Sequence, residues 1–241
     1  MKQRLLGIFL VLLFAGQLQA DDAASAFPGL TTLEIGDAAY GAKILVHFNP
    51  ALAVVVNKPM AESTEMDEPV IHVLDFYLDA SKTRKLELNF TNGMSDDPSF
   101  EVRLAGAASP QEYGENMFGA LEVFIPGNGA IYASGHTNNT FNRRQKYSFD
   151  GTKLIESKQP YYYVGLNSKA LRDLAIYPDQ AAAEKAKGAP LAVIAKGAEL
   201  TVLINEGEFY LLKSTFGLVG WVKLNPSQSA EDIAGLFFAG D

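Results

Sequence analysis

The residues best suited to chemistry lie together in the segment SGHTNNTFNRR, residues 134–144. Imidazole, amide and guanidinium groups can jointly hydrogen-bond a sugar or a carboxylate, and an arginine can hold a carboxylate through two parallel bonds. The candidate ligand-binding residues in this segment are His136, Asn138, Asn139, Arg143 and Arg144. The alternative is a turn-rich surface loop whose asparagines hydrogen-bond their own backbone.

Aromatic residues of the C-terminal part are a second set of candidates. We predict that Tyr177 and Tyr210, together with Phe209, can line a ligand-binding surface. Trp221 is the only tryptophan and follows a glycine in the stretch FGLVGWVKL. Because its ring is large and its N–H needs a partner, we expect packing in the core or at an edge of a small barrel, with ligand contact as the alternative.

Three consecutive tyrosines occur in KQPYYYVGL, residues 158–166. In a strand, Tyr161 and Tyr163 would point to one face and Tyr162 to the other. This pattern favours packing of tyrosine between two domains, and a platform for stacking carbohydrate is the alternative.

Motifs for catalysis are sparse in this sequence. The chain has no cysteine, which excludes thiol catalysis and cysteine-bound zinc. His47 and His72 lie inside strand-like runs at no recognised metal-ligand spacing, so we predict neither metal nor cofactor. A nucleophile elbow, a phosphate-binding loop and a dinucleotide fingerprint are absent as well. We therefore expect a protein that is not an enzyme.

The first residues resemble a secretory signal peptide. Lys2 and Arg4 precede a short apolar run, and small residues follow it, so we expect residues 1–20 to be removed on export. The net charge of −8 argues against nucleic acid as a partner. With export and the lack of cysteine, this predicts a periplasmic or secreted bacterial protein that does not insert into a membrane after cleavage.

Residues 21–170 are predicted to form one antiparallel β domain, a sandwich or an open barrel. KLELNFT and FEVRL alternate apolar and polar residues with period two, which is typical of half-buried strands. AKILVHF, LAVVVN, VIHVLDFYL and ALEVFI are further strand-like runs. YSFDGTKLIE predicts a hairpin that turns at Asp150 and Gly151. Residues 62–69 and 107–119 lack apolar periodicity and are expected to be exposed loops.

Residues 171–226 are predicted to form a small second domain of short strands. Its front segment DQAAAEKAKG reads as a helical turn or a surface loop. AVIAKGAELTVL followed by YLLKSTFGLVGWVKL resembles the bacterial SH3 family, SH3b, through a Lys-Gly turn and a closing GWV. The resemblance implies a small SH3-like barrel that attaches to cell-wall peptidoglycan or to peptides. The place where the family usually carries a groove-forming segment reads LAIYPDQAAAEK, which departs from the family pattern.

Residues 227–241 are predicted to form a short C-terminal helix or tail. Ser229 can cap a helix whose Ile233, Leu236 and Phe237 would share one face. Docking of this helix on the body is the favoured interpretation, and binding of a partner is the alternative.

The resulting hypothesis is an exported, non-catalytic binding or scaffolding protein of the bacterial envelope. Its expected partner is a cell-wall glycan, a peptide or another envelope protein. Two alternatives remain open at this point. One is a cell-wall hydrolase targeted by an SH3b module, and the other is an inhibitor or chaperone-like partner of another secreted protein.

Overall fold

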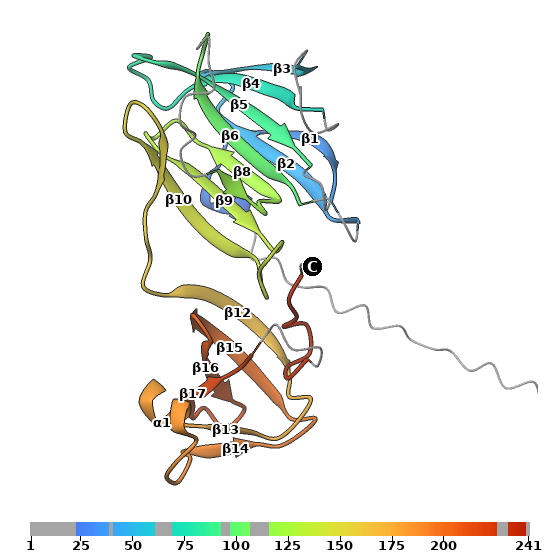
Figure 1. Ribbon diagram of the computed structural model, residues 1–241, viewed down its shortest axis with the longest axis vertical. Coiled ribbons are helices and arrows are strands. Elements are labelled where there is room, and N and C mark those ends of the chain that lie inside the picture. The colour runs from blue at the N-terminus through green and yellow to red at the C-terminus, as the bar shows by residue number, and fades with distance from the viewer. Residues whose placement is uncertain are drawn as a thin grey trace, which may run out of the picture.

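The computed structural model describes residues 23–38, 41–60, 69–92, 97–106, 116–225 and 231–239 (Figure 1). These residues form mainly β-strands arranged in several antiparallel sheets, so the predicted fold class is confirmed. The predicted signal peptide, residues 1–20, lies outside the described residues. In the described ranges, no helix has both the length and the apolar character needed to cross a membrane.

Two sheets form the N-terminal unit, and their inner faces share one hydrophobic core. The six-stranded sheet has the order β1 (Thr31–Asp37), β2 (Lys43–Phe48), β8 (Glu122–Ile125), β9 (Ile131–Gly135), β10 (Arg143–Phe149) and β11 (Leu154–Glu156). The five-stranded sheet has the order β3 (Ala53–Pro59), β4 (Ile71–Tyr77), β5 (Lys85–Thr91), β6 (Ser99–Leu104) and β7 (Met117–Phe118). A short 3-10 helix, η1 (Ala23–Ala26), precedes them. This is a β-sandwich.

The period-two patterns place their apolar residues in this core as predicted. Leu86, Leu88 and Phe90 of β5 are buried, as are Phe100 and Val102 of β6. Neighbouring strands run antiparallel except for β2 and β8, which are parallel. This one parallel pair was not predicted, because the pairing of strands far apart in sequence is not encoded in their alternation.

The predicted hairpin forms between β10 and β11. Asp150 Oδ1 accepts hydrogen bonds from the backbone N–H groups of Thr152 and Lys153, and Gly151 has a φ of 108°. That φ favours glycine, which is the reason for the Asp-Gly pair at the turn.

The C-terminal unit contains a four-stranded sheet in the order β12 (Tyr162–Lys169), β15 (Glu199–Glu206), β16 (Phe209–Ser214) and β17 (Val219–Lys223). β13 (Leu174–Ile176) and β14 (Ala192–Ile194) form a separate pair. Within the described residues these sheets do not close into a barrel. Residues 162–169, which the sequence assigned to the first domain, form β12, and β12 pairs with β15 of this sheet.

Gly220 and Trp221 join the two sheets of the C-terminal unit. Trp221 and Tyr177 exchange two backbone hydrogen bonds of 2.7 and 2.8 Å. A Cβ atom on Gly220 would lie 2.8 Å from the Tyr177 carbonyl oxygen, so only glycine allows this approach. Trp221 lies half-buried on the edge strand β17, while its neighbour Val222 points into the core. Of the two predicted locations for Trp221, in the core or at an edge, the structure therefore shows the edge.

The predicted helical turn is α1 (Gln180–Lys185). Asp179 caps its N-terminus by accepting a hydrogen bond from the Ala182 N–H, and Ala186 ends it in a left-handed conformation. Lys223 of β17 forms an ion pair with Glu184, which holds the helix over the outer side of that strand.

The predicted C-terminal helix is absent from residues 231–239, and Ser229 lies outside the described residues. Ile233 and Leu236 are nevertheless buried in the C-terminal core, so this segment docks on the body as expected. Its backbone bonds to other segments, with the Ala234 N–H donating to Lys169 O and the Ala239 N–H to Asn139 O. A short isolated helix is only marginally stable, and these long-range bonds replace its internal ones.

Residues 137–141, between β9 and β10 of the sandwich, contact the C-terminal unit. Phe141 is buried in the C-terminal core, although it follows β9 of the sandwich. The Thr140 hydroxyl is hydrogen-bonded to the Tyr210 hydroxyl over 2.8 Å. The candidate binding segment is thus held from both sides, by the C-terminal core and by the tail (Figure 1).

Candidate functional site

A cavity of about 400 Å³ lies beside this connecting segment, and we call it the edge cavity. It opens between the edge strand β7 of one sheet and β10 and β11 of the other. The residues that line it are Asn116, Phe118, Thr137, Asn138, Asn139, Arg143, Gln145, Tyr147 and Glu156. Three of the predicted candidates, Asn138, Asn139 and Arg143, are among them.

Strand alternation separates the two arginines of the predicted site. Arg143 lies on the same face of β10 as Gln145 and Tyr147, which is the face toward the cavity. Arg144 pairs in register with Ser134 and lies on the opposite face. A ligand in the edge cavity therefore meets one arginine and not the predicted pair.

Arg143 is held in place by the first strand of the C-terminal unit. Its guanidinium carbon lies 3.9 Å from the centre of the Tyr162 ring, and its Nη2 donates to the Tyr162 hydroxyl. That hydroxyl in turn donates to Glu156 Oε1 over 3.2 Å. The stacking of a cation on a ring and the bridging hydroxyl fix the guanidinium at the cavity wall. Tyr162 is thus the tyrosine at the domain junction, as predicted, and Tyr161 and Tyr163 are exposed.

A tight turn presents the two asparagines. The Asn139 N–H donates to His136 O over 3.0 Å, and Asn138 has a φ of 55°, a conformation that asparagine tolerates well. The Asn138 side chain donates to Asp97 Oδ2, and the Asn139 side chain donates to Thr137 O. The asparagines do bond within the protein, as the alternative interpretation expected. Their Oδ1 atoms have no hydrogen-bond partner among the described residues and remain free to accept.

His136 is near the edge cavity without lining it. Its Nε2 donates to the backbone oxygen of Phe237 over 3.3 Å, and the two rings lie 5.2 Å apart. Burial lowers the pKa of His136 from its ordinary value of 6.5, against the opposing effect of its bonds to Phe237 and Asn142. His136 therefore anchors the tail and does not face a ligand.

The lowered pKa of His136 predicts a loss of stability on acidification. The unfolded chain binds a proton at the ordinary pKa, and the native chain binds it only at lower pH, so stability falls as the pH drops through 6.5. We expect the free energy of unfolding in urea to decrease between about pH 7.5 and 5.5, and the decrease to be smaller in His136→Gln. An equal decrease in both proteins would show that other groups cause it.

Tyr177 and Tyr210, the aromatic candidates, belong to the C-terminal core. Both are buried, and Tyr210 is only 2% exposed. Burial raises the pKa of Tyr210, and its hydroxyl is hydrogen-bonded to that of Thr140. A buried ring offers no surface to a ligand, so the structure removes both residues from the candidate site.

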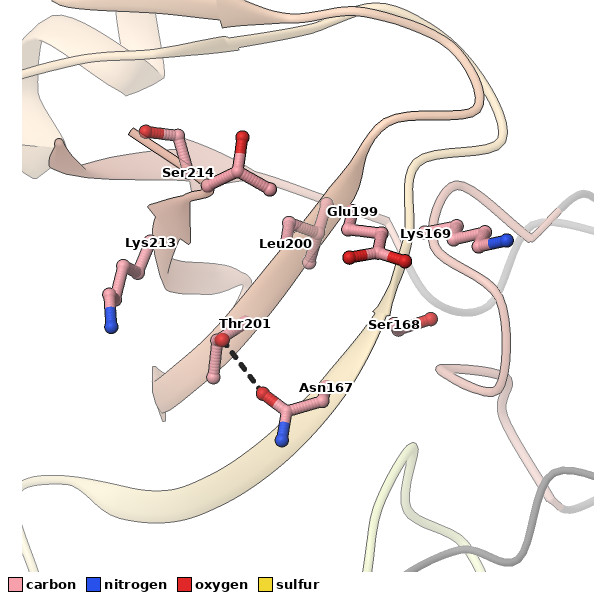
Figure 2. A pocket seen from close by; sticks show the side chains of 9 residues that line it. Asn167, Ser168, Lys169, Glu199, Leu200, Thr201, Lys213 and Ser214 are labelled. Carbon is pink, nitrogen blue, oxygen red and sulfur yellow. Dashed lines mark hydrogen bonds between the residues drawn. The ribbon is translucent and has the colours of Figure 1, made fainter. Parts of the chain in front are cut away.

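A second cavity of about 390 Å³ lies on the C-terminal sheet (Figure 2). Its lining residues come from β12, β15, β16 and the turn after β16: Asn167, Ser168, Lys169, Glu199, Leu200, Thr201, Lys213, Ser214 and Thr215. The Thr201 hydroxyl donates to Asn167 Oδ1 over 2.8 Å within it. Its lining contains no aromatic residue and no arginine, which makes it the weaker candidate.

Sequence reasoning missed Phe118, Gln145 and Glu156 of the edge cavity. Gln145 follows Arg143 by two positions, so it would have been found had the strand been predicted to begin at Arg143. Phe118 belonged to a predicted loop, residues 107–119, whose last part forms β7. Comparisons with family models, with curated proteins and with solved structures found no match.

Proposed function

We propose that this chain is an exported, non-catalytic binding protein of the bacterial cell envelope, and that the edge cavity holds a segment of a glycan. The observation that carries the proposal is the convergence of three side-chain amides, from Asn138, Asn139 and Gln145, with Arg143 and Phe118 on one cavity.

The chemistry of this lining suits a sugar better than a charged polymer. Amides hydrogen-bond hydroxyl groups as both donors and acceptors. Phe118 is 53% exposed and can stack on the apolar face of a sugar ring. The net charge of −8 disfavours a polyanionic ligand. Peptidoglycan, which the SH3b resemblance of the C-terminal unit also implies, is the ligand class we propose.

The number of carboxyl groups in the cavity favours a binding function over glycoside hydrolysis. Glycoside hydrolysis normally needs two carboxyl groups, one on each side of the scissile bond. The described lining contributes one, Glu156, and this carboxylate already accepts a hydrogen bond from Tyr162. We therefore propose retention of the glycan without its cleavage.

The substitution Phe118→Ala tests the proposal. Loss of the stacking surface should weaken binding of soluble peptidoglycan fragments about 5–10-fold, corresponding to about 1–1.5 kcal/mol. Isothermal titration calorimetry on the purified protein measures this change. Gln145→Ala should weaken binding by a similar factor, because it removes an amide from the same wall.

Phe216→Ala is the matched control, because Phe216 is 88% exposed and lies outside the cavity lining. Equal binding by wild type and Phe118→Ala would contradict the proposal. Release of new reducing ends from peptidoglycan would favour the hydrolase alternative. Binding to free stem peptide, without affinity for glycan strands, would show that the ligand is a peptide and not a glycan.

A further inference from the structure

A cluster of three potential metal ligands lies on the five-stranded sheet, on the side away from the sandwich core. β4 and β5 lie side by side in this sheet (Figure 1). His72 and Asp75 belong to β4, and Glu87 belongs to β5. One ligand atom from each lies within 4.8 Å of the others. We call these residues the β4–β5 cluster. It shares no residue with the edge cavity.

A β-bulge brings the two β4 ligands to one face. His72 pairs in register with Asn89, and Asp75 pairs with Glu87, while Val73 between them is the extra residue of the bulge. In a regular strand, residues three apart point to opposite faces. The bulge therefore turns His72 and Asp75 to the same side, as bulges beside functional sites often do.

The contact between His72 and Asp75 is not a hydrogen bond. His72 Nε2 lies 3.0 Å from Asp75 Oδ1, yet this buried nitrogen has no partner with hydrogen-bond geometry among the described residues. Two ligands of one ion would lie close to each other in this way without bonding each other. Lys85 Nζ lies 2.6 Å from Asp75 Oδ2, which leaves Oδ1 for the ion.

Asn89 is the independent observation that points to a ligand. It is 1% exposed, and within the part of the chain that the structure describes both its Oδ1 and its Nδ2 are buried without a hydrogen-bond partner. A buried amide without partners is costly, so its retention calls for an explanation. As the cross-strand partner of His72, it lies on the same face, with Cβ atoms of such pairs about 5 Å apart. A cation between His72 and Glu87 would give Asn89 Oδ1 a partner.

Glu101 continues the cluster on β6. It pairs in register with Asn89. Its Oε1 is also buried with no partner in the described ranges, while its Oε2 accepts a hydrogen bond from Arg103. A carboxylate in this position can accept a hydrogen bond from Asn89 Nδ2 or from a water bound to the ion. Such outer contacts orient the ligands of a metal site.

We propose that the β4–β5 cluster binds one divalent transition-metal ion of the Zn²⁺ or Mn²⁺ class. The ligands are His72 Nε2, one oxygen each from Asp75 and Glu87, and Asn89 Oδ1. An imidazole ligand selects such ions over Mg²⁺ and Ca²⁺, which take oxygen ligands. The two carboxylates balance the charge of the ion, and Lys85 offsets part of their repulsion when the site is empty.

Titration of the purified, metal-stripped protein with Zn²⁺ alone tests this assignment. We expect one Zn²⁺ per chain by isothermal titration calorimetry. His72→Gln and Glu87→Gln should each weaken the affinity at least about 100-fold, since loss of a ligand exceeds the 10–100-fold effect of outer residues. His136→Gln and Glu208→Gln remove a histidine and an acid elsewhere. Their affinity for Zn²⁺ should stay within about twofold of the wild type, because neither residue is a ligand or an outer contact of the β4–β5 cluster. Affinity should fall on acidification, because a ligating histidine must be neutral.

Two outcomes would overturn the site: no stoichiometric binding by the wild type, or binding that His72→Gln and Glu87→Gln leave intact. If circular dichroism shows that the variants do not fold, NMR of the imidazole nitrogens of the wild-type protein tests the site instead. Zn²⁺ must then shift the resonances of His72 and leave those of His136 in place. A shift at His136 alone, or at neither ring, would refute the proposal.

Discussion

Replacement of Tyr210 by alanine is expected to lower the free energy of unfolding of the C-terminal unit by about 3–5 kcal/mol. The Tyr210 side chain is buried in the core of that unit, in one cluster with Leu200, Val202, Leu212 and Val222. Its removal leaves a cavity that the surrounding strands cannot collapse to fill. Urea unfolding followed by circular dichroism measures the change, and a unit this small has little stability to lose.

Tyr210→Phe separates the hydroxyl from the ring. The ring stays packed, and the buried Thr140 hydroxyl loses its partner across the junction of the units, which should cost about 1–2 kcal/mol. Tyr161→Ala is the matched control, since Tyr161 is exposed, and its effect should stay within about 0.5 kcal/mol. If Tyr210→Ala were as stable as Tyr161→Ala, the ring could not occupy the core.

The position of Tyr210 shows a limit of prediction from the apolar pattern of a strand. In the strand FYLLKS, Phe209 and Leu211 alternate with Tyr210 and Leu212, so both faces are apolar and the pattern does not identify the inner one. β5 and β6 were easier, because one face of each carries charged residues. The same ambiguity led to Tyr210 being predicted at a ligand-binding surface.

Arg143 and Arg144 illustrate a second limit. The sequence located the turn around Asn138 and Asn139 correctly, because turn residues act through local hydrogen bonds. It did not show that the strand begins at Arg143, which decides that the two arginines point to opposite faces. The partner of Arg143, Tyr162, comes from another sheet, and no local pattern predicts that contact.

The β4–β5 cluster depends on information of the same long-range kind. His72 is fifteen positions from Glu87, a separation that matches none of the short metal-ligand motifs. Pairing of β4 with β5 and the bulge at Val73 bring them together, and neither can be predicted from composition or periodicity. The prediction of no metal site rested on spacing along the sequence alone. The β4–β5 cluster is brought together across two strands, where that spacing does not apply.

Gly135→Ala is expected to be among the most damaging single-methyl changes in the sandwich, at about 3 kcal/mol or more, the upper end of the usual cost of overpacking. A Cβ atom at Gly135 would lie 1.9 Å from Gly119 O and 2.8 Å from the Ala120 Cα. Both are backbone atoms of the turn between β7 and β8, so no side chain can rotate away. The end of β9, which leads into the turn of Asn138 and Asn139, would have to move.

Gly36→Ala provides the matched control, because Gly36 is also a strand glycine and has no atom within 4 Å of the added methyl group. Its stability should equal or slightly exceed that of the wild type, since alanine restricts the unfolded chain. Thermal and urea unfolding of both variants give the comparison. Because Gly135→Ala displaces the turn, it should also weaken glycan binding beyond the 5–10-fold effect of Phe118→Ala. A Gly135→Ala protein with wild-type stability would mean that β9 and the β7–β8 turn do not approach this closely.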